Sequence, residues 1–268
     1  MNLPLDTIAT RLDGHVLYAT FLAPPINLIG PEVVRDLVTL LEEIYRPSPI
    51  RVVVFDSADP DFLFPHIDMT KVAEHTASLG MLFHKLSQAP VVTITKLRGR
   101  ARGAGSEFVL ACDMCFASQE HAILGQPEVG IGASPGAGGI QHLARRLGRS
   151  RALEVILSSE DVSAQLAERY GWINRAVPDS ELDRFTEQIA QRIAAFPAEA
   201  MVSAKAAVNV LTVPVPDAVR ADAALFQRLV LTAAVPRRTA QLFERGFQTR
   251  SPAELRLGDT LGQLPATD

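Results

Sequence analysis

Short apolar runs alternate with longer amphipathic segments over roughly the first 200 residues of this chain. The short runs contain many β-branched and aromatic residues and are bounded by turn residues or charges, which is typical of buried strands. The longer segments repeat apolar residues every three or four positions, as helices do. Such alternation favours an α/β fold. We expect strands at residues 16–21, 51–55, 91–95, 114–117 and 122–124.

The helical segments become almost continuous after Gly136. Before that point, Pro31 begins a helix that runs to about Arg46, since Pro is tolerated in the first turn, and residues 69–87 predict one or two more. Later helices are expected at 140–147, 151–157, 164–170, 180–195, 198–211, 217–234 and 237–247. We therefore divide the chain into an α/β core, residues 1–200, and a C-terminal helical region, residues 201–268.

The last two helices carry more apolar side chains than one thin strip of core can take up. Such a surface must cover either the chain's own core or another subunit, and we expect a partner surface. The residues are Leu225, Phe226, Leu229, Val230, Leu242, Phe243 and Phe247.

Composition and charge narrow the classes of function. The 268 residues are 47% apolar and 21% charged, with a net charge of −4. A nucleic-acid binder usually has a basic excess, so we expect no nucleic-acid partner. No apolar run reaches the length of a membrane span, and the N-terminus lacks the features of a secretory signal. We therefore expect a cytoplasmic protein without a membrane partner.

Two local motifs have both a chemical and a structural interpretation. Cys112 and Cys115 form a C-x-x-C pair, which suits redox or metal chemistry, but zinc needs four ligands and no second pair exists. We expect no metal and interpret both as small buried residues, at a helix end and a strand start. Ser134 lies in a literal G-x-S-x-G, but the only later histidine is His142, eight residues on. We interpret this motif as a tight turn before a helix rather than a hydrolase nucleophile.

Four cations, Lys96, Arg98, Arg100 and Arg102, occur within seven residues. They would suit contacts to the phosphates of a ligand, or form a solvated basic loop. The chain has no phosphate-binding G-x-x-x-x-G-K-[ST] and no G-x-G-x-x-G after a strand, so a nucleotide cofactor is not indicated.

The Gly-rich turn from Gly103 to Glu107 opens onto an apolar run. A helix that starts there presents free backbone N–H groups, which suit a negative charge that forms during a reaction. Glu128 follows in a second turn-rich segment. An electrophilic backbone pocket beside two glutamates suits acid/base chemistry next to an oxyanion.

These residues resemble the crotonase superfamily, also called the enoyl-CoA hydratase/isomerase family. Residues 99–113, GRARGAGSEFVLACD, resemble its G-x-x-x-G-G-G-x-E-L and A-C-D segments. Residues 125–143, GQPE followed by PGAGG and QHL, resemble its F-G-x-P-E and P-G-x-G-G segments, and residues 25–28, PINL, resemble its early R-P-x-x-N-A-L turn.

The resemblance implies a fold, an activity and a set of site residues. The fold would be a crotonase-like spiral of ββα turns with a C-terminal helical region that forms a homotrimer or a dimer of trimers. The substrate would be an acyl-CoA thioester, with no cofactor beyond the CoA it carries. The N–H groups of Ile67 and Ala104 would hold the thioester oxygen, and Glu107 and Glu128 would be the catalytic pair of a 2-enoyl-CoA hydratase. Substrate contacts would come from Asn27, His66, Asp68, Gly103, Pro127, Gly136 and Arg245.

The chain departs from the family pattern around one of the two donors. The segment from Phe62 to Asp68 is one residue longer than the family's F-x-A-G-A-D, with His66 at a small-residue position, which leaves the donor's register open by one residue. Arg245 stands near the place of a family Lys that contacts CoA. These changes keep alternatives open: double-bond isomerisation, acyl-CoA hydrolysis or decarboxylation with His66 as an extra acid or base, and a non-catalytic or RNA-binding homologue that uses the cations at 96–102.

Overall fold

The computed structural model describes residues 4–71 and 76–266. Its largest sheet has six strands in the order β1-β2-β3-β5-β7-β10. The pair β1–β2 is antiparallel, and the other neighbouring pairs in this sheet are parallel. The strands are β1 (Ile8–Asp13), β2 (Val16–Phe21), β3 (Val52–Ser57), β5 (Val92–Leu97), β7 (Met114–Ser118) and β10 (Arg175–Val177).

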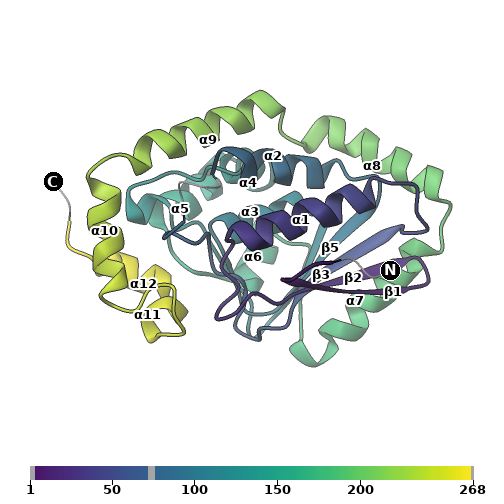
Figure 1. Ribbon diagram of the computed structural model, residues 1–268, viewed down its shortest axis with the longest axis horizontal. Coiled ribbons are helices and arrows are strands. Elements are labelled where there is room, and N and C mark those ends of the chain that lie inside the picture. Colours follow the sequence, from purple (N-terminus) through teal and green to yellow (C-terminus); the bar gives the residue numbers. More distant parts are fainter. Residues whose placement is uncertain (1–3, 72–75, 267–268) are drawn as a thin grey trace.

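Helices cover both faces of the sheet and continue beyond it (Figure 1). Helices α8 and α9 form an arch along the top of the view, and α10, α11 and α12 lie at the end opposite the N-terminus. The helices are α1 (Pro31–Ile44), α2 (Thr76–Ser87), α3 (Ala104–Ala111), α4 (Gly139–Leu147), α5 (Arg149–Ser158), α6 (Ala164–Tyr170), α7 (Asp179–Ala194), α8 (Ala198–Thr212), α9 (Pro216–Val230), α10 (Ala234–Phe243), α11 (Pro252–Leu255) and α12 (Leu257–Gly262).

Both faces of the central strand β3 are buried. Val53 and Phe55 lie in the main core cluster, which also takes in the apolar faces of α1, α2 and α3. Val52 and Val54 point to the opposite face and pack in the cluster that α7 covers. Side chains alternate along a strand, so a continuous apolar run is what a parallel strand between two helical layers requires.

A second, smaller sheet brings three loops of the chain to one place. It has the order β4-β6-β8-β9, and β4, β6 and β8 are parallel. The carboxyl ends of parallel strands meet at one edge of a sheet, where ligand sites commonly form. The segments that follow these three ends are residues 65–68, 103–107 and 126–131. The strands are β4 (Phe62–Phe64), β6 (Arg100–Arg102), β8 (Ile123–Gly125) and β9 (Val162–Ser163).

The predicted α/β organisation is confirmed, and each of the five expected strands is present with ends shifted by up to two residues. The pattern did not indicate β1, β4, β6, β9 and β10. β1 has a largely exposed face, and the other four have only two or three residues, too few for a periodicity to show. The expected boundary at residue 200 falls near the start of α8, and the division into two regions stays a prediction.

Three of the expected helices have ends that differ from the structure by three residues or more. The helix expected at 217–234 ends at Val230, and the one expected at 237–247 runs from Ala234 to Phe243. Helix α2 begins at Thr76, and residues 72–75 of the helical segment expected at 69–87 lie outside the described residues. The short helices α11 and α12 were not expected, because the turns around them interrupt any helical repeat.

The apolar C-terminal helices cover their own chain more than the sequence suggested. Phe226, Leu242 and Phe247 are buried in one cluster with residues 131, 257 and 261. Exposed apolar side chains lie instead on α8, where Val210 and Leu211 are 85% and 83% exposed, and directly after α9, where Leu231 is 87% exposed. Within the described chain, no single helix is long and apolar enough to cross a membrane. Helices α8 and α9 meet that test only as a pair, which is bent by 55°.

Candidate active site

The predicted Gly-rich turn begins helix α3. Gly103 has φ +52° and ψ −126°, a backbone conformation that L side chains rarely adopt. Its carbonyl accepts from Glu107 N at 2.9 Å, which closes the first turn of the helix. The N–H of Ala104 belongs to that first turn and has no partner within the helix. At Gly105 a Cβ would lie 2.1 Å from the carbonyl oxygen of Phe64, so α3 rests directly on the end of β4.

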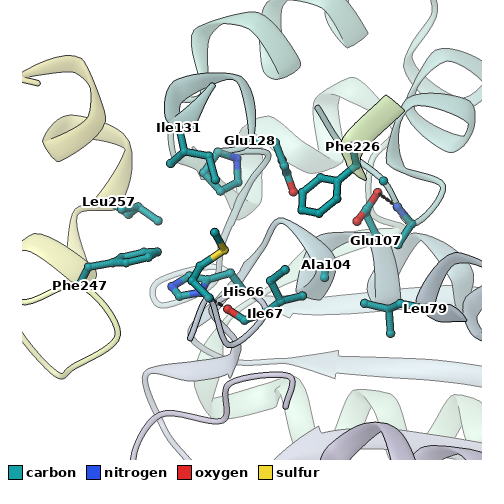
Figure 2. Close-up of a pocket in the computed structure, with 14 residues that line it drawn as sticks. His66, Ile67, Leu79, Ala104, Glu107, Glu128, Ile131, Phe226, Phe247 and Leu257 are labelled. Atoms are coloured by element: carbon teal, nitrogen blue, oxygen red, sulfur yellow. Dashed lines mark hydrogen bonds between the residues drawn. The ribbon is translucent and has the colours of Figure 1, made fainter. Parts of the chain in front are cut away.

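Ile67 follows β4 and reaches the same place from another strand. It pairs with Ile29: Ile29 N donates to His66 O and Asp68 N donates to Ile29 O, each at 3.0 Å. Backbone groups alternate in direction along an extended segment, so the N–H of Ile67 points away from Ile29. Ile67 and Ala104 both line one pocket, so the two N–H positions implied by the resemblance lie together (Figure 2).

Glu107 stands one helical turn after Ala104, on the same face of α3. Its carboxylate is buried, and Oε1 accepts from the backbone N–H groups of Ala137 and Gly139 at 2.7 and 2.8 Å. Burial raises the pKa of Glu107 to about 7, and the two backbone donors only partly oppose this. The loop that begins α4 therefore fixes the orientation of a carboxyl that titrates near neutrality.

Glu128 faces the same pocket from the turn after β8. Its Oε2 accepts from the side-chain amide of Gln126 at 3.3 Å, and its Oε1 lies close above Gly103. Burial raises the pKa of Glu128 well above its ordinary value, and the negative charge of Glu107 raises it further. Two carboxyls that interact in this way titrate as a pair. The arrangement favours a state in which Glu107 is ionised while Glu128 keeps its proton.

The pocket that holds both glutamates is otherwise lined mostly by apolar side chains. Phe226 of α9 stands beside the glutamates, and Phe247 and Leu257 close the other side together with Ile131 (Figure 2). The space, with its open mouth, measures about 600 Å³. It therefore combines apolar walls with two carboxyls and with the two residues, Ile67 and Ala104, that the resemblance implies as donors. The lining residues are His66, Ile67, Met69, Leu79, Ala104, Glu107, Pro127, Glu128, Ile131, Gly136, Ala137, Phe226, Phe247 and Leu257.

Comparison with known proteins assigns the chain to a family. A family model described as enoyl-CoA hydratase/isomerase matches residues 11–246. The chain belongs to the enoyl-CoA hydratase/isomerase family. A probable enoyl-CoA hydratase from Rhizobium meliloti is 38% identical over 235 residues, which cover 85% of this chain and 91% of the relative.

Other members of the family are similar over most of their length. A short-chain-enoyl-CoA hydratase from Clostridium acetobutylicum is 28% identical over 214 residues, 76% of this chain and 82% of the relative. Among solved structures, a candidate enoyl-CoA hydratase from Streptomyces avermitilis is 65% identical, with a TM-score of 0.97 over 99% of this chain and 100% of that one. The expected crotonase fold is thereby confirmed.

Several residues that the family resemblance assigned to the substrate lie in this pocket, and others do not. His66, Pro127 and Gly136 line it. Asn27 is outside the lining, and its side chain bonds within its own turn and donates to Ser57 Oγ at 2.7 Å. Asp68 accepts from the backbone and hydroxyl of Thr70. Arg245 is exposed just after α10. Gly103 is outside the lining as well, and the substrate roles of all seven residues stay predictions.

His66 is a packed side chain, which was one of its two interpretations. Its Nδ1 lies 2.9 Å from Ile67 O, and its Nε2 lies 3.1 and 3.2 Å from the two carboxylate oxygens of Glu254. The ring stacks on Phe247 with 4.4 Å between the ring centroids. Both nitrogens are occupied within the protein, which removes the reason for treating His66 as an extra acid or base of a variant reaction.

Neither interpretation of the four cations at 96–102 was right. Each is hydrogen-bonded within the chain, and Arg102 is only 1% exposed. Arg100 donates to the carbonyl of Leu255 at 2.8 Å. These cations hold the core to α7 and to the C-terminal segment, which removes the reason for proposing an RNA site. The ion pairs are Lys96 with Asp56 and Asp183, Arg98 with Asp179 and Asp183, and Arg102 with Asp161.

The structure confirms the expected places of the two cysteines. Cys112 ends α3 and Cys115 lies in β7, both as buried free thiols, and burial raises the pKa of Cys112 to about 12. Ser134 lies in the irregular segment before α4, whereas a nucleophile elbow needs a strand before it. Within the residues that the structure describes, no hydrogen bond joins Ser134 to His142, and no group of three His, Cys, Asp or Glu side chains is placed to hold a metal ion.

Sequence reasoning missed part of the pocket wall and one polar neighbour. Gln126, which donates to Glu128, stands two residues before it in the family motif, so the motif itself contained the signal. Phe226 and Leu257 come from segments more than a hundred residues after Glu107. Phe226 was expected on a partner surface and Leu257 was not singled out, because no local pattern indicated what they would cover.

The raised pKa of Glu107 predicts how stability depends on pH. Between its ordinary value of 4.5 and about 7, the folded state keeps a proton that the unfolded state has released, so stability falls as pH rises and levels off above about 7. The loss is on the order of 3 kcal/mol. Denaturant melts of the wild type and of Glu107→Gln, run from pH 4.5 to 7.5, are expected to diverge, with the wild type losing more. If the stability of the two proteins changed with pH in the same way, the raised pKa of Glu107 would be contradicted.

Proposed function

We propose that this protein is a cytoplasmic enzyme that hydrates a 2-enoyl-CoA thioester to the 3-hydroxyacyl-CoA. One observation carries the proposal: two buried glutamates face a pocket that Ile67 and Ala104, whose N–H groups are the proposed donors, also line. Backbone donors held in a dry site stabilise an oxyanion strongly, each contributing about 2.7–4 kcal/mol to the barrier. CoA enters as part of the substrate, and the chemistry needs no other cofactor.

The proposed reaction uses the two carboxyls in opposite protonation states. Ionised Glu107 takes a proton from water as the water oxygen bonds to C3 of the enoyl group. The electron pair of the double bond moves toward the thioester, whose oxygen becomes an enolate held by the Ile67 and Ala104 N–H groups. Glu128 then gives its proton to C2, which completes the addition. The raised pKa values of both groups support this division of roles.

The direct test is an assay of hydration. Incubation with 2-enoyl-CoAs of increasing chain length is expected to remove the absorbance of the conjugated thioester, and thermal stabilisation by CoA and by acyl-CoAs reads out binding separately. A protein that binds CoA but turns over no chain length is not a hydratase. Isomerisation, hydrolysis and decarboxylation are the alternative reactions if no hydration is found. The contacts of His66 give no reason to prefer any of them.

We also propose that the active form is a homotrimer or a dimer of trimers. Support comes from α8, on which Val210 and Leu211 are almost fully exposed, since apolar surface of this kind is stabilised by a partner. Arg245 is then a candidate for a CoA contact from a neighbouring subunit. Removing everything from Ala218 onward is expected to leave an insoluble or monomeric, inactive chain, since Phe226, Phe247 and Leu257 are lost with it.

A point variant tests the assembly without removing the pocket. Leu211→Asp is expected to lower the mass found by light scattering to that of a monomer. Leu22→Asp is the matched control, because Leu22 is also exposed, at 53%, but lies outside the C-terminal helices. A monomeric wild type at micromolar concentration would overturn the proposal and the cross-subunit role of Arg245 with it.

A further inference from the structure

The segment after α10 returns to the pocket and contacts the residue that carries one of the two N–H donors. The side-chain amide of Gln248 donates to the carbonyl of Ile67 at 3.0 Å. Gln248 is itself held by Glu254, whose carboxylate accepts from the Gln248 backbone N–H at 2.9 Å. Gln248, held in turn by Glu254, thus fixes the backbone of Ile67, and neither of these two residues lines the pocket.

His66 makes a second contact to the same carbonyl, and its Nδ1 lies 3.4 Å from the side-chain nitrogen of Gln248. Its Nδ1 is 2.9 Å from Ile67 O, a contact drawn as a dashed line in Figure 2, and its Nε2 faces the Glu254 carboxylate. An oxygen at that distance must meet an N–H, since two lone pairs would repel. With a proton on Nδ1 the ring donates to Ile67 O, while its Nε2 pairs with the Glu254 carboxylate. The carbonyl of Ile67 accepts from two fixed donors, Gln248 and His66.

The same carboxylate lies beside the strand that leads to the second donor. Arg102, the last residue of β6, directly precedes the Gly103–Ala104 turn. Its guanidinium donates to the carbonyl of Glu254 at 2.9 Å and lies 3.7 Å from the Glu254 carboxylate, while Asp161 takes its other side at 2.6 and 2.7 Å. Glu254 is completely buried, so these contacts are shielded from water.

We propose that Gln248 and Glu254 are positioning residues for the oxyanion hole: they fix the Ile67 backbone through its carbonyl and through His66, so that the hole is complete only when the C-terminal segment is docked. The inference rests on the proposed function in so far as the Ile67 N–H is a donor to the thioester oxygen. Its physical basis is that such donors act only when held close to the productive geometry, here within about 0.5 Å.

Two variants and one control separate positioning from docking in general. Gln248→Met removes the donor to Ile67 with little change in size, and Glu254→Gln removes the charge that holds His66. Arg250→Met is the control, because Arg250 ties the same segment to Asp59 and Asp61 but touches neither His66 nor Ile67 within the described contacts. Thermal melts confirm folding, and if Glu254→Gln does not fold, Gln248→Met alone decides.

The first readout measures how strongly the oxyanion hole polarises a bound thioester, and it needs no turnover. Bound 4-dimethylaminocinnamoyl-CoA absorbs at longer wavelength when its thioester carbonyl is polarised by hydrogen bonds. We expect a red shift with the wild type and with Arg250→Met, and a smaller shift with both test variants. The second readout is hydration: kcat is expected to fall by about 10-fold or more, the usual cost of losing a group that orients a reactive one, with KM nearly unchanged.

Each outcome decides the proposal. A full red shift and an unchanged kcat in Gln248→Met overturn the proposal. If Arg250→Met loses as much red shift and kcat as the test variants, docking of the segment in general, and not the contacts of Gln248 and Glu254, is responsible, and the proposal is also overturned. If the wild type gives no red shift, the proposed oxyanion hole and this inference are both refuted. A wild type that shows the red shift but hydrates no enoyl-CoA refutes the proposed function alone, since the shifts of the variants still test the positioning role.

Discussion

Replacing Glu107 by glutamine is expected to lower kcat for enoyl-CoA hydration by at least ~100-fold, the usual scale for a general acid or base. The amide oxygen can still accept from Ala137 and Gly139, so the loop stays in place while the proton acceptor is lost. Because the neutral side chain resembles the protonated acid that burial favours, the variant should be no less stable than the wild type at pH 7.5. Steady-state kinetics and denaturant melts on the same preparations check both statements.

The same substitution separates hydration from isomerisation. An isomerase that relies on Glu128 alone would keep most of its rate in Glu107→Gln, whereas a hydratase would not. Glu42→Gln is a suitable control, since Glu42 is exposed on α1. Retention of hydratase activity within a few-fold would remove Glu107 from the mechanism.

Ala104→Pro is expected to reduce turnover by at least ~100-fold, since proline has no N–H to donate to the thioester oxygen. Ala104 is the first residue of α3, the one helical position where proline is tolerated because its N–H has no partner in the helix. The proline ring also occupies the space in front of the donor, which adds to the loss. Circular dichroism is expected to show an unchanged helical content.

Ala198→Pro provides the matched control for that variant. Ala198 is likewise the first residue of a helix, α8, and it is exposed and absent from the pocket lining. It should keep wild-type kcat and fold normally. Wild-type activity in Ala104→Pro would mean that the Ala104 N–H is not part of the oxyanion hole.

Local sequence determined the parts of this protein that depend on neighbouring residues. The Gly103 turn, the start of α3 and the position of Glu107 one turn later follow from backbone freedom and helical periodicity. The five predicted strands follow from short apolar runs, and the family motif placed both glutamates. These features could be predicted because they depend on interactions that span only a few residues.

Tertiary structure alone decided what surrounds those features. Arg102 is one of four similar cations in the sequence, and only the fold shows that it is buried against Asp161 and the C-terminal segment. His66 likewise gains its partner, Glu254, from 188 residues away. Contacts over such separations depend on how strands and helices pack, and no periodicity along the chain records them. The sequence therefore determined which groups can do the chemistry, whereas the packing of distant segments decided which of them are held in place to do it.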